Sequence, residues 1–262
     1  MNMWHIVSII FGAIVGSFLN VCISRLPKGE SVVRPISHCP KCNTPIRVYD
    51  NIPILSYILL RAKCRYCHDP ISVQYPLVEG ITALSSLLLF IKFGPSLSYL
   101  FYFVFVAALI VITVIDLYHQ IIPDVISLPG IVVGLLGSAL GLVGPLVISQ
   151  VTFWASLIGV ISGGGSLYLV ATVYHWLFKR EGMGGGDVKL LAMIGAFLGW
   201  KAVILTILLS SFIGSLIGIT VILIRGKDFK YAIPFGPFLS LGAVFSLFWG
   251  EDLIRWYLYL NG

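Results

Sequence analysis

Two aspartates are candidates for acid–base chemistry. Asp116 ends a long apolar run, and Asp187 follows three glycines, Gly184 to Gly186, and opens another apolar run. The chain has only eleven acidic residues, and an ionisable group at membrane depth is costly and commonly functional. Two carboxyls held together in a partly dry site do not both ionise, so one can act as a base on water while the other polarises a carbonyl. The pair therefore predicts hydrolysis by an aspartic mechanism.

Structural roles remain open for both residues at this point. An aspartate at a helix start is commonly an N-cap, which is the alternative for Asp187, and interfacial hydration is the alternative for Asp116. Asp124 follows Pro123 at the start of the next apolar run, and we expect it to cap that helix. The triple glycine does not indicate a phosphate loop, because it lacks the GxxxxGK[ST] pattern and a preceding strand.

Four of the five cysteines form two CxxC pairs, Cys39-Pro-Lys-Cys42 and Cys64-Arg-Tyr-Cys67. Two such pairs about 20 residues apart can offer four thiolates to one tetrahedral zinc ion. The pattern predicts a structural zinc site with Cys39, Cys42, Cys64 and Cys67 as ligands. Four unligated thiols are the alternative, and the absence of a thioredoxin-like strand–helix context argues against a redox pair. Cys22 is expected to be a small buried apolar residue.

The elements that carry these residues are those of a membrane protein. Hydrophobic residues make up 58% of the chain and charged residues only 11%, whereas soluble domains carry about 25% charged residues. A membrane-spanning helix needs about 20 mostly apolar residues. The sequence therefore predicts an all-α polytopic membrane protein without a cleaved signal peptide and with about eight transmembrane helices. The apolar runs cover residues 4–23, 76–91, 97–115, 121–143, 151–178, 188–200, 202–224 and 234–247.

The distribution of Lys and Arg predicts the orientation in the membrane. If the loop 25–75 is cytoplasmic, fourteen of the 17 basic residues fall on that side and three on the other. The positive-inside rule then predicts that both aspartates lie at the cytoplasmic face of the cell membrane and that both termini lie outside. The net charge of +6 reflects this topology rather than nucleic-acid binding. We expect three parts: a first helix (1–24), a cytoplasmic loop with the zinc site (25–75) and a membrane domain (76–262).

Several separated segments together resemble the type IV prepilin peptidases. Gly184-Gly185-Gly186-Asp187 fits the GxGD motif of membrane aspartic proteases, and the double-CxxC loop is similar to the cysteine-bearing members of the family. The resemblance covers nearly the whole chain. It also includes Gly16-Ser17-Phe18-Leu19-Asn20-Val21, Asn51-Ile52-Pro53, Tyr75-Pro76-Leu77-Val78-Glu79 and the segment from Asp116 to Asp124.

The resemblance implies that Asp116 and Asp187 form the catalytic pair, with Gly184 and Gly186 as supporting motif residues. It implies a prepilin or pseudopilin substrate whose basic leader is cut on the cytoplasmic side after a Gly. Many members also methylate the new N-terminus with S-adenosylmethionine as donor, an activity linked to the cytoplasmic loop. One departure lies in that loop, where many members have a glycine before the third cysteine and this chain reads Leu60-Arg61-Ala62-Lys63-Cys64.

Other functions stay open from the sequence. A peptidase without methyltransferase activity fits the same motifs, and a cation transporter with interfacial aspartates fits the acidic residues, although transporter sites lie near the midplane. A membrane scaffold with a zinc knuckle is a further alternative. Glu79, Asp124 and Glu181 are available to attract a basic leader, with capping or hydration as the alternative for each. The sequence does not indicate an oligomeric state.

Overall fold

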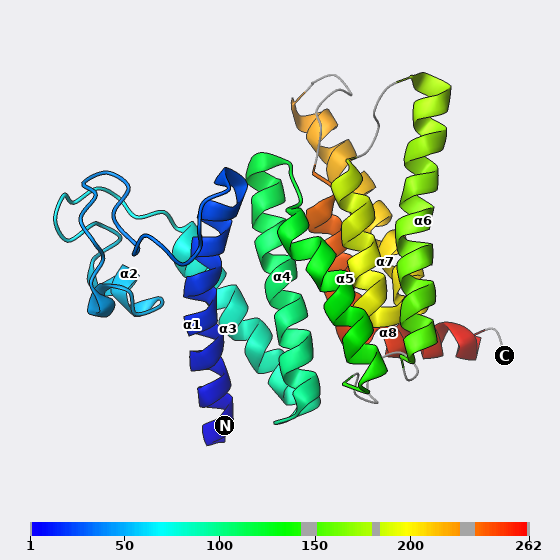
Figure 1. Cartoon of the computed structure of the whole chain (residues 1–262), viewed down its shortest axis with the longest axis horizontal. Helices are drawn as coiled ribbons and strands as arrows, with labels where there is room; N and C mark the ends of the chain where they lie inside the picture. The colour runs from blue at the N-terminus through cyan, green and yellow to red at the C-terminus, as the bar shows by residue number, and fades with distance from the viewer. Residues whose placement is uncertain (1, 143–150, 180–183, 226–233, 261–262) are drawn as a thin grey trace. The chain divides into compact units, whose positions relative to one another are not determined.

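In the computed structural model, which describes residues 2–142, 151–179, 184–225 and 234–260, the chain is folded entirely into helices and loops (Figure 1). Over these residues the only strand-like pairings are two isolated bridges in the first long loop. The all-α fold class is therefore confirmed. The α-helices are α1 (Met3–Arg25), α2 (Leu55–Leu59), α3 (Gln74–Phe93), α4 (Leu97–His119), α5 (Asp124–Ala139), α6 (Phe153–Phe178), α7 (Gly185–Arg225) and α8 (Gly236–Leu260).

The helices identify a multi-pass membrane protein. Within the described residues, α1, α3, α4, α6 and α7 are each long and apolar enough to cross a membrane, and α5 is a shorter apolar helix. Each predicted apolar run falls on one of the helices. The runs 188–200 and 202–224 share α7, whose 41 residues exceed the roughly 20 that span a bilayer. Gly199 interrupts this helix with a non-helical φ of 76°, two residues before Lys201, at which the sequence divides the two runs.

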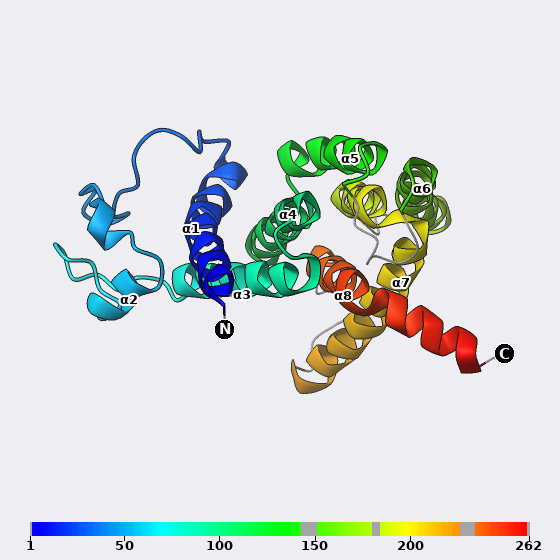
Figure 2. The ribbon, with the colours of Figure 1, turned by 90° about the horizontal axis from the view of Figure 1, so that it is seen from below.

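The chain divides into two compact units, with the boundary between Val111 and Ile112 inside α4. In the first unit, α1 and α3 lie side by side (Figure 2). Gly12 permits this approach, because a Cβ there would lie 2.6 Å from the Cβ of Ser86. The Ser86 hydroxyl donates to the Ser8 carbonyl across the same contact at 2.7 Å. Small residues and hydrogen bonds of this kind are what joins helices in membranes.

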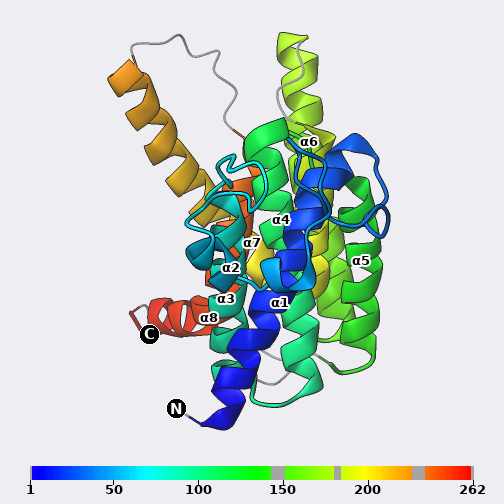
Figure 3. The ribbon, with the colours of Figure 1, turned by 90° about the vertical axis from the view of Figure 1, so that its left-hand side faces the viewer.

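The loop between α1 and α3 carries the short helix α2 (Figure 3). Arg25, at the end of α1, is buried and donates to the carbonyl oxygens of Ser31 and Pro35 at 2.9 and 2.7 Å. Because a buried guanidinium needs such acceptors, these bonds fix the path by which the chain leaves the membrane helix.

The second unit is built around the first half of α7, which packs against α5, α6 and α8. Leu190, Leu191, Met193 and Ile194 are fully buried there. The closest approach is to α6, where a Cβ on Gly195 would lie 2.1 Å from the backbone oxygen of Gly159. This packing fixes the first turn of α7, which carries Asp187.

Candidate active site and metal centre

Asp116 lies in the last turn of α4 and is 5% exposed. Its Oδ2 accepts a hydrogen bond from the backbone N–H of Gly236 at 3.0 Å. Gly236 begins α8, so the first N–H groups of that helix have no helical partner and are free to bind an anionic group. The start of α8 therefore fixes one oxygen of the Asp116 carboxyl.

Asp187 lies in the first turn of α7 and is partly buried. It is close enough to Asp116 for the two carboxyls to interact electrostatically. Both residues belong to the second compact unit. The structure thus brings together two carboxyls that are 71 positions apart in the printed sequence, and it places one of them at a helix start and the other at a helix end.

Two glycines make room for the pair. A Cβ on Gly236 would lie 2.6 Å from Oδ2 of Asp116, and a Cβ on Gly186 would lie 2.8 Å from the Cβ of Ile122. The same Cβ on Gly236 would lie 3.3 Å from Cδ1 of Ile122. Ile122 therefore packs between the glycine before Asp187 and the glycine that binds Asp116. Gly184, in contrast, is exposed, and a Cβ there would come no closer than 4.0 Å to the Gly186 nitrogen.

Asp124 has a different environment. Its carboxylate oxygens accept hydrogen bonds from Nζ of Lys189 at 2.7 and 2.8 Å. The expected capping role is wrong, because α5 has Pro123 at its N-cap and no side-chain capping bond. Asp124 is thus neutralised by a lysine two residues beyond Asp187. Glu181 lies outside the described residues.

The four cysteines of the loop lie in two turns of the same design. In the first turn the Cys39 N–H binds the Thr44 carbonyl at 3.0 Å and the Asn43 N–H binds the Cys39 carbonyl at 2.9 Å. In the second the equivalent bonds join Cys64 to Asp69 at 2.8 Å and His68 to Cys64 at 3.0 Å. The residue after each second cysteine, Asn43 or His68, has a positive φ. Each CxxC pair therefore forms its own knuckle.

The sulfur atoms of Cys39, Cys42, Cys64 and Cys67 all lie within 4.8 Å of one another. Zn–S bonds of about 2.3 Å in a tetrahedron require sulfur–sulfur distances of about 3.8 Å, and the Cys39 and Cys67 sulfurs are 3.8 Å apart. Lys41 of the first knuckle and Asp69 of the second form an ion pair of 2.8 Å that joins the two. The residues therefore fit a four-sulfur metal site, as the sequence predicted.

The electrostatics of this cluster also suit a cation. Hydrogen bonds with the side chain and backbone of Thr44 lower the pKa of Cys42 to about 6. At Cys67 a backbone hydrogen bond from Asp69 lowers the pKa, but desolvation and the other three cysteines outweigh it and raise the pKa to about 12. Four thiolates this close repel one another, and a divalent cation among them removes that repulsion.

Comparison with known proteins covers nearly the whole chain. Residues 10–93 match the Bacterial Peptidase A24 N-terminal domain, and residues 103–219 match the Type IV leader peptidase family. A protein of Aeromonas hydrophila named prepilin leader peptidase/N-methyltransferase is 39% identical over 277 residues, covering 95% of this chain and 92% of the relative. The chain belongs to the type IV leader peptidase family. It is therefore an enzyme, a membrane peptidase.

Two further relatives of this peptidase carry the same name. The protein of Pseudomonas aeruginosa is 37% identical over 282 residues, with 97% of this chain and 93% of the relative covered. That of Legionella pneumophila is 34% identical over 275 residues, with 95% and 92% covered. No solved structure gave a significant match to the chain. Family membership decides against the cation transporter and the scaffold.

Sequence reasoning missed three partners in this peptidase. The Gly236 N–H donates to Asp116, and the Ile122 side chain packs beside Gly186 and Gly236. Lys189 neutralises Asp124. Gly236 is one of the 27 glycines of the chain, and nothing local distinguishes it from the others. Lys189 offered a signal, because a lysine in the first turns of a helix can pair with a carboxylate of a neighbouring element, here Asp124.

Proposed function

We propose that this peptidase cleaves the basic leader from type IV prepilins or pseudopilins after a Gly, with Asp116 and Asp187 as its catalytic pair. The observation that carries the proposal is the juxtaposition of the two carboxyls, with one oxygen of Asp116 held by the Gly236 N–H. The names of the relatives support the substrate class.

In the proposed mechanism the two carboxyls have complementary protonation states. The ionised one accepts a proton from water, whose oxygen attacks the carbonyl carbon of the scissile bond, and the protonated one donates a hydrogen bond to the carbonyl oxygen. The C–N bond then breaks, and the carboxyl that took the proton from water gives it to the leaving nitrogen, which becomes the new N-terminus. The Gly236 N–H fixes the orientation of Asp116 throughout, because its bond to Oδ2 is made before any substrate arrives.

The membrane setting suits such a substrate. We propose that the basic loop and both aspartates face the cytoplasm and both termini face the outside, as the Lys and Arg distribution indicates. A prepilin lies in the membrane through its own hydrophobic helix, and its basic leader stays on the cytoplasmic side. A catalytic pair at helix ends meets the junction between the two parts.

We also propose that the loop 25–75 is a separate functional module that binds a structural zinc ion and takes part in N-methylation of the cleaved pilin. Cys39, Cys42, Cys64 and Cys67 would hold the ion, whose binding would supply folding free energy to a loop with little apolar core. S-adenosylmethionine supplies an electrophilic methyl group when bound, and the new N-terminal amine is its acceptor. The bifunctional names of the relatives support this activity.

The segment Leu60–Cys64, in which many family members have a glycine and this chain has none, forms a turn in the backbone. Arg61 and Ala62 both have positive φ, 51° and 58°, a region in which glycine carries no steric cost. Ala62 is held there by two hydrogen bonds, from its N–H to the Tyr57 carbonyl at 2.9 Å and to its carbonyl from the Ile71 N–H at 2.7 Å. The chain therefore forms, without a glycine, a turn of the kind that glycine favours. This supports methyltransferase activity in the loop.

The test is cleavage of a prepilin by the purified protein in detergent. Asp116→Asn and Asp187→Asn should each lower kcat/KM by about a thousandfold or more, because general acid–base catalysis commonly contributes about 10²–10⁴-fold. Asp124→Asn is the matched control and should cleave normally, since Asp124 is paired with Lys189. Normal cleavage by a folded Asp116→Asn or Asp187→Asn variant would remove that residue from the pair.

A further inference from the structure

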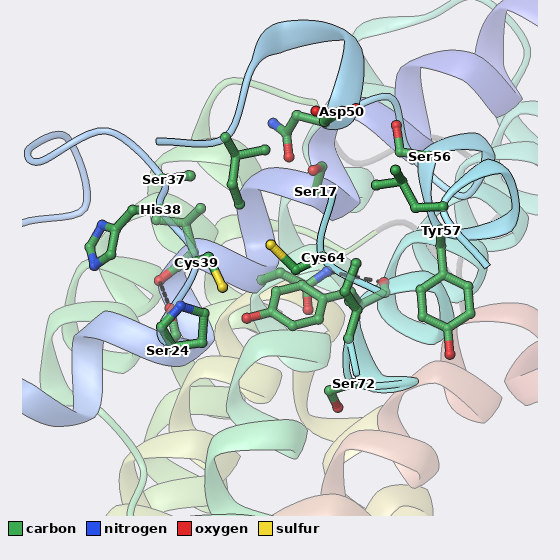
Figure 4. Close-up of a pocket in the computed structure, with 18 of the residues that line it drawn as sticks. Ser17, Ser24, Ser37, His38, Cys39, Asp50, Ser56, Tyr57, Cys64 and Ser72 are labelled. Atoms are coloured by element: carbon green, nitrogen blue, oxygen red, sulfur yellow. Dashed lines mark hydrogen bonds between the residues drawn. The ribbon is translucent and has the colours of Figure 1, made fainter. Parts of the chain in front are cut away.

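The first unit contains a cavity that the peptidase mechanism does not use. It has a volume of about 450 Å³ and lies among α1, the start of α3 and the cysteine loop. Figure 4 shows Ser17 and Ser24 of α1 together with Asp50, Tyr57 and Cys64 of the loop around it. Small-molecule sites commonly have volumes of about 300–1,000 Å³. The cavity is therefore large enough for a ligand of nucleoside size.

Three of the segments singled out in the sequence meet at this cavity. Asn20 of the α1 segment donates through Nδ2 to the Tyr75 carbonyl at 3.1 Å. Glu79 on α3 accepts through Oε2 from the Ile54 N–H at 2.7 Å, directly after the segment 51–53. Asn20, Tyr75, Ile54 and Glu79 all line the cavity. Neither the aspartate pair nor the metal cluster explains why these segments converge.

Asn20 has an unused acceptor at the cavity. The side chain is 3% exposed, and its Oδ1 is buried without a hydrogen-bond partner. The assignment of the amide is fixed chemically, because the other atom, Nδ2, donates to the carbonyls of Gly16 and Tyr75 and only an NH₂ group can do so. A buried acceptor that lacks a hydrogen-bond donor is destabilising. Oδ1 of Asn20 is thus available to accept a hydrogen bond from a bound ligand.

Glu79 presents a carboxylate without a cationic partner. It is 7% exposed and lies beside the Ser17 hydroxyl. The ion pairs found among the described residues involve other acids, namely Asp69, Asp50, Asp124 and Glu251. A buried charge without a partner is strongly disfavoured, so a cationic ligand would bind here with little competition.

The backbone at Ile54 is strained where it meets this carboxylate. Ile54 has a φ of 62° and a ψ of −48°, which a β-branched residue rarely adopts. In this conformation its N–H donates to Oε2 of Glu79. Strain of this kind is concentrated at ligand sites, where the surrounding structure enforces it.

We propose that this cavity is the binding site of the methyl donor S-adenosylmethionine. Glu79 pairs with a positively charged group of this molecule, and Oδ1 of Asn20 accepts a hydrogen bond from one of its N–H or O–H groups. The inference rests on the methyltransferase part of the proposed function. The donor carries an ammonium, a sulfonium, a carboxylate and an adenine. The cavity offers a partner for each: Glu79 for the cations, Lys28 for the carboxylate, and Tyr57 and Tyr66 for the ring.

The alternative occupant is the α-amine of the cleaved pilin, which is also a cation. Two features favour the donor. The volume exceeds what one terminal residue fills, and the lining combines basic, acidic and aromatic side chains, whereas a terminal amine needs only acceptors. The acceptor amine must then reach the donor through the open side of the cavity.

The experiment measures S-adenosylmethionine binding to the full-length, zinc-loaded protein in detergent by titration calorimetry. Glu79→Gln keeps an oxygen for the Ile54 N–H but removes the charge, and it should weaken binding about tenfold or more, because a hydrogen bond to a charged group contributes about 1.5–3 kcal/mol. Ser24→Trp, at an exposed position on the rim, should abolish binding by filling the cavity. Glu251→Gln, the same substitution outside the cavity, should bind as the parent chain does.

Zinc content and prepilin cleavage are measured on every variant and should be unchanged, which establishes that each is folded. If the parent chain binds the donor and both Glu79→Gln and Ser24→Trp bind it equally well, the site is elsewhere and the proposed function stands. If Glu79→Gln leaves donor binding intact but raises KM for the pilin acceptor, the cavity holds the amine instead and the donor site is overturned. A parent chain that binds no donor contradicts the methyltransferase activity itself, and this inference with it.

Discussion

At the scale of single residues, the glycines before Asp187 differ in what surrounds them. A Cβ on Gly186 would lie 2.8 Å from the Cβ of Ile122, whereas a Cβ on Gly185 meets nothing within 4 Å. Gly186→Ala should therefore displace the start of α7 and lower prepilin cleavage by about a hundredfold, the loss expected for a misplacement near 1 Å. Gly185→Ala should cleave normally, as measured by kcat/KM.

A second substitution tests the cause of that loss. Ile122→Gly removes the Cβ, Cγ1 and Cδ1 atoms that a methyl group at position 186 would meet. The double variant with Gly186→Ala should recover most of the cleavage that Gly186→Ala loses. If the double variant is as inactive as the single one, glycine is needed at this position for another reason than the space beside Ile122.

The backbone conformation of Ala62 leads to a prediction about the stability of the loop. Its φ of 58° costs an L-residue roughly 1 kcal/mol relative to glycine. Ala62→Gly should therefore make the loop more resistant to unfolding by about 0.5–1 kcal/mol, and Ala62→Val should make it less so. Hydrogen exchange of the loop amides measures both, and protection that falls in Ala62→Gly would contradict the assigned backbone conformation.

At the scale of elements, the cysteine loop depends on its metal. The two knuckles share one ion pair, Lys41–Asp69, and exposed pairs contribute only about 0–1 kcal/mol. A chelator, or Cys64→Ser, should thus release one zinc ion per chain and expose residues 37–70 to proteases. Metal analysis and limited proteolysis follow both effects. Cys22→Ser, in α1 and outside the cluster, is the control and should retain the metal.

The helices themselves could largely be predicted from the sequence, because apolar runs of the length of a bilayer have few alternative folds. The two CxxC pairs likewise predicted the metal cluster. Two cysteines separated by two residues can place both thiols in one turn, so only the approach of the two turns had to be inferred. The sequence predicted two separate apolar runs that meet at Lys201. It did not indicate that they form one helix, α7, interrupted by the non-helical Gly199. Glycine is common in membrane helices, so composition does not reveal which one bends the chain.

The surroundings of the candidate sites were much less predictable. Asp116 and Asp187 were found from their rarity and their motif, yet the Gly236 N–H that binds Asp116 comes from the last helix. Glu79 was expected to attract a basic leader, with helix capping or hydration as the alternative, and the structure buries it with its carboxylate accepting from the Ile54 N–H. Such contacts join positions far apart in the chain, and no local pattern encodes them.

At the scale of the whole molecule, the proposed orientation can be tested with membrane-impermeant thiol labels. Labelling is measured relative to the Cys22→Ser parent, in which the four loop cysteines remain. In this background Ser96→Cys, at an exposed position between α3 and α4, should add label only in right-side-out vesicles. Glu30→Cys, exposed in the loop after α1, should react only in inverted ones. The reason is the excess of Lys and Arg in that loop. The opposite labelling pattern would place the proposed catalytic face outside the cell.

The bond between Asp116 and Gly236 also has a consequence for biosynthesis. Its two partners are 120 positions apart, so α4 leaves the ribosome long before the start of α8 is made. The cysteine knuckles, complete by residue 70, can take up their metal at a time when the carboxyl of Asp116 still lacks its backbone donor. A nascent chain is therefore expected to acquire the loop early and the ability to cut peptides only when its final helix is inserted, which keeps an unfinished protease from acting on its neighbours in the membrane.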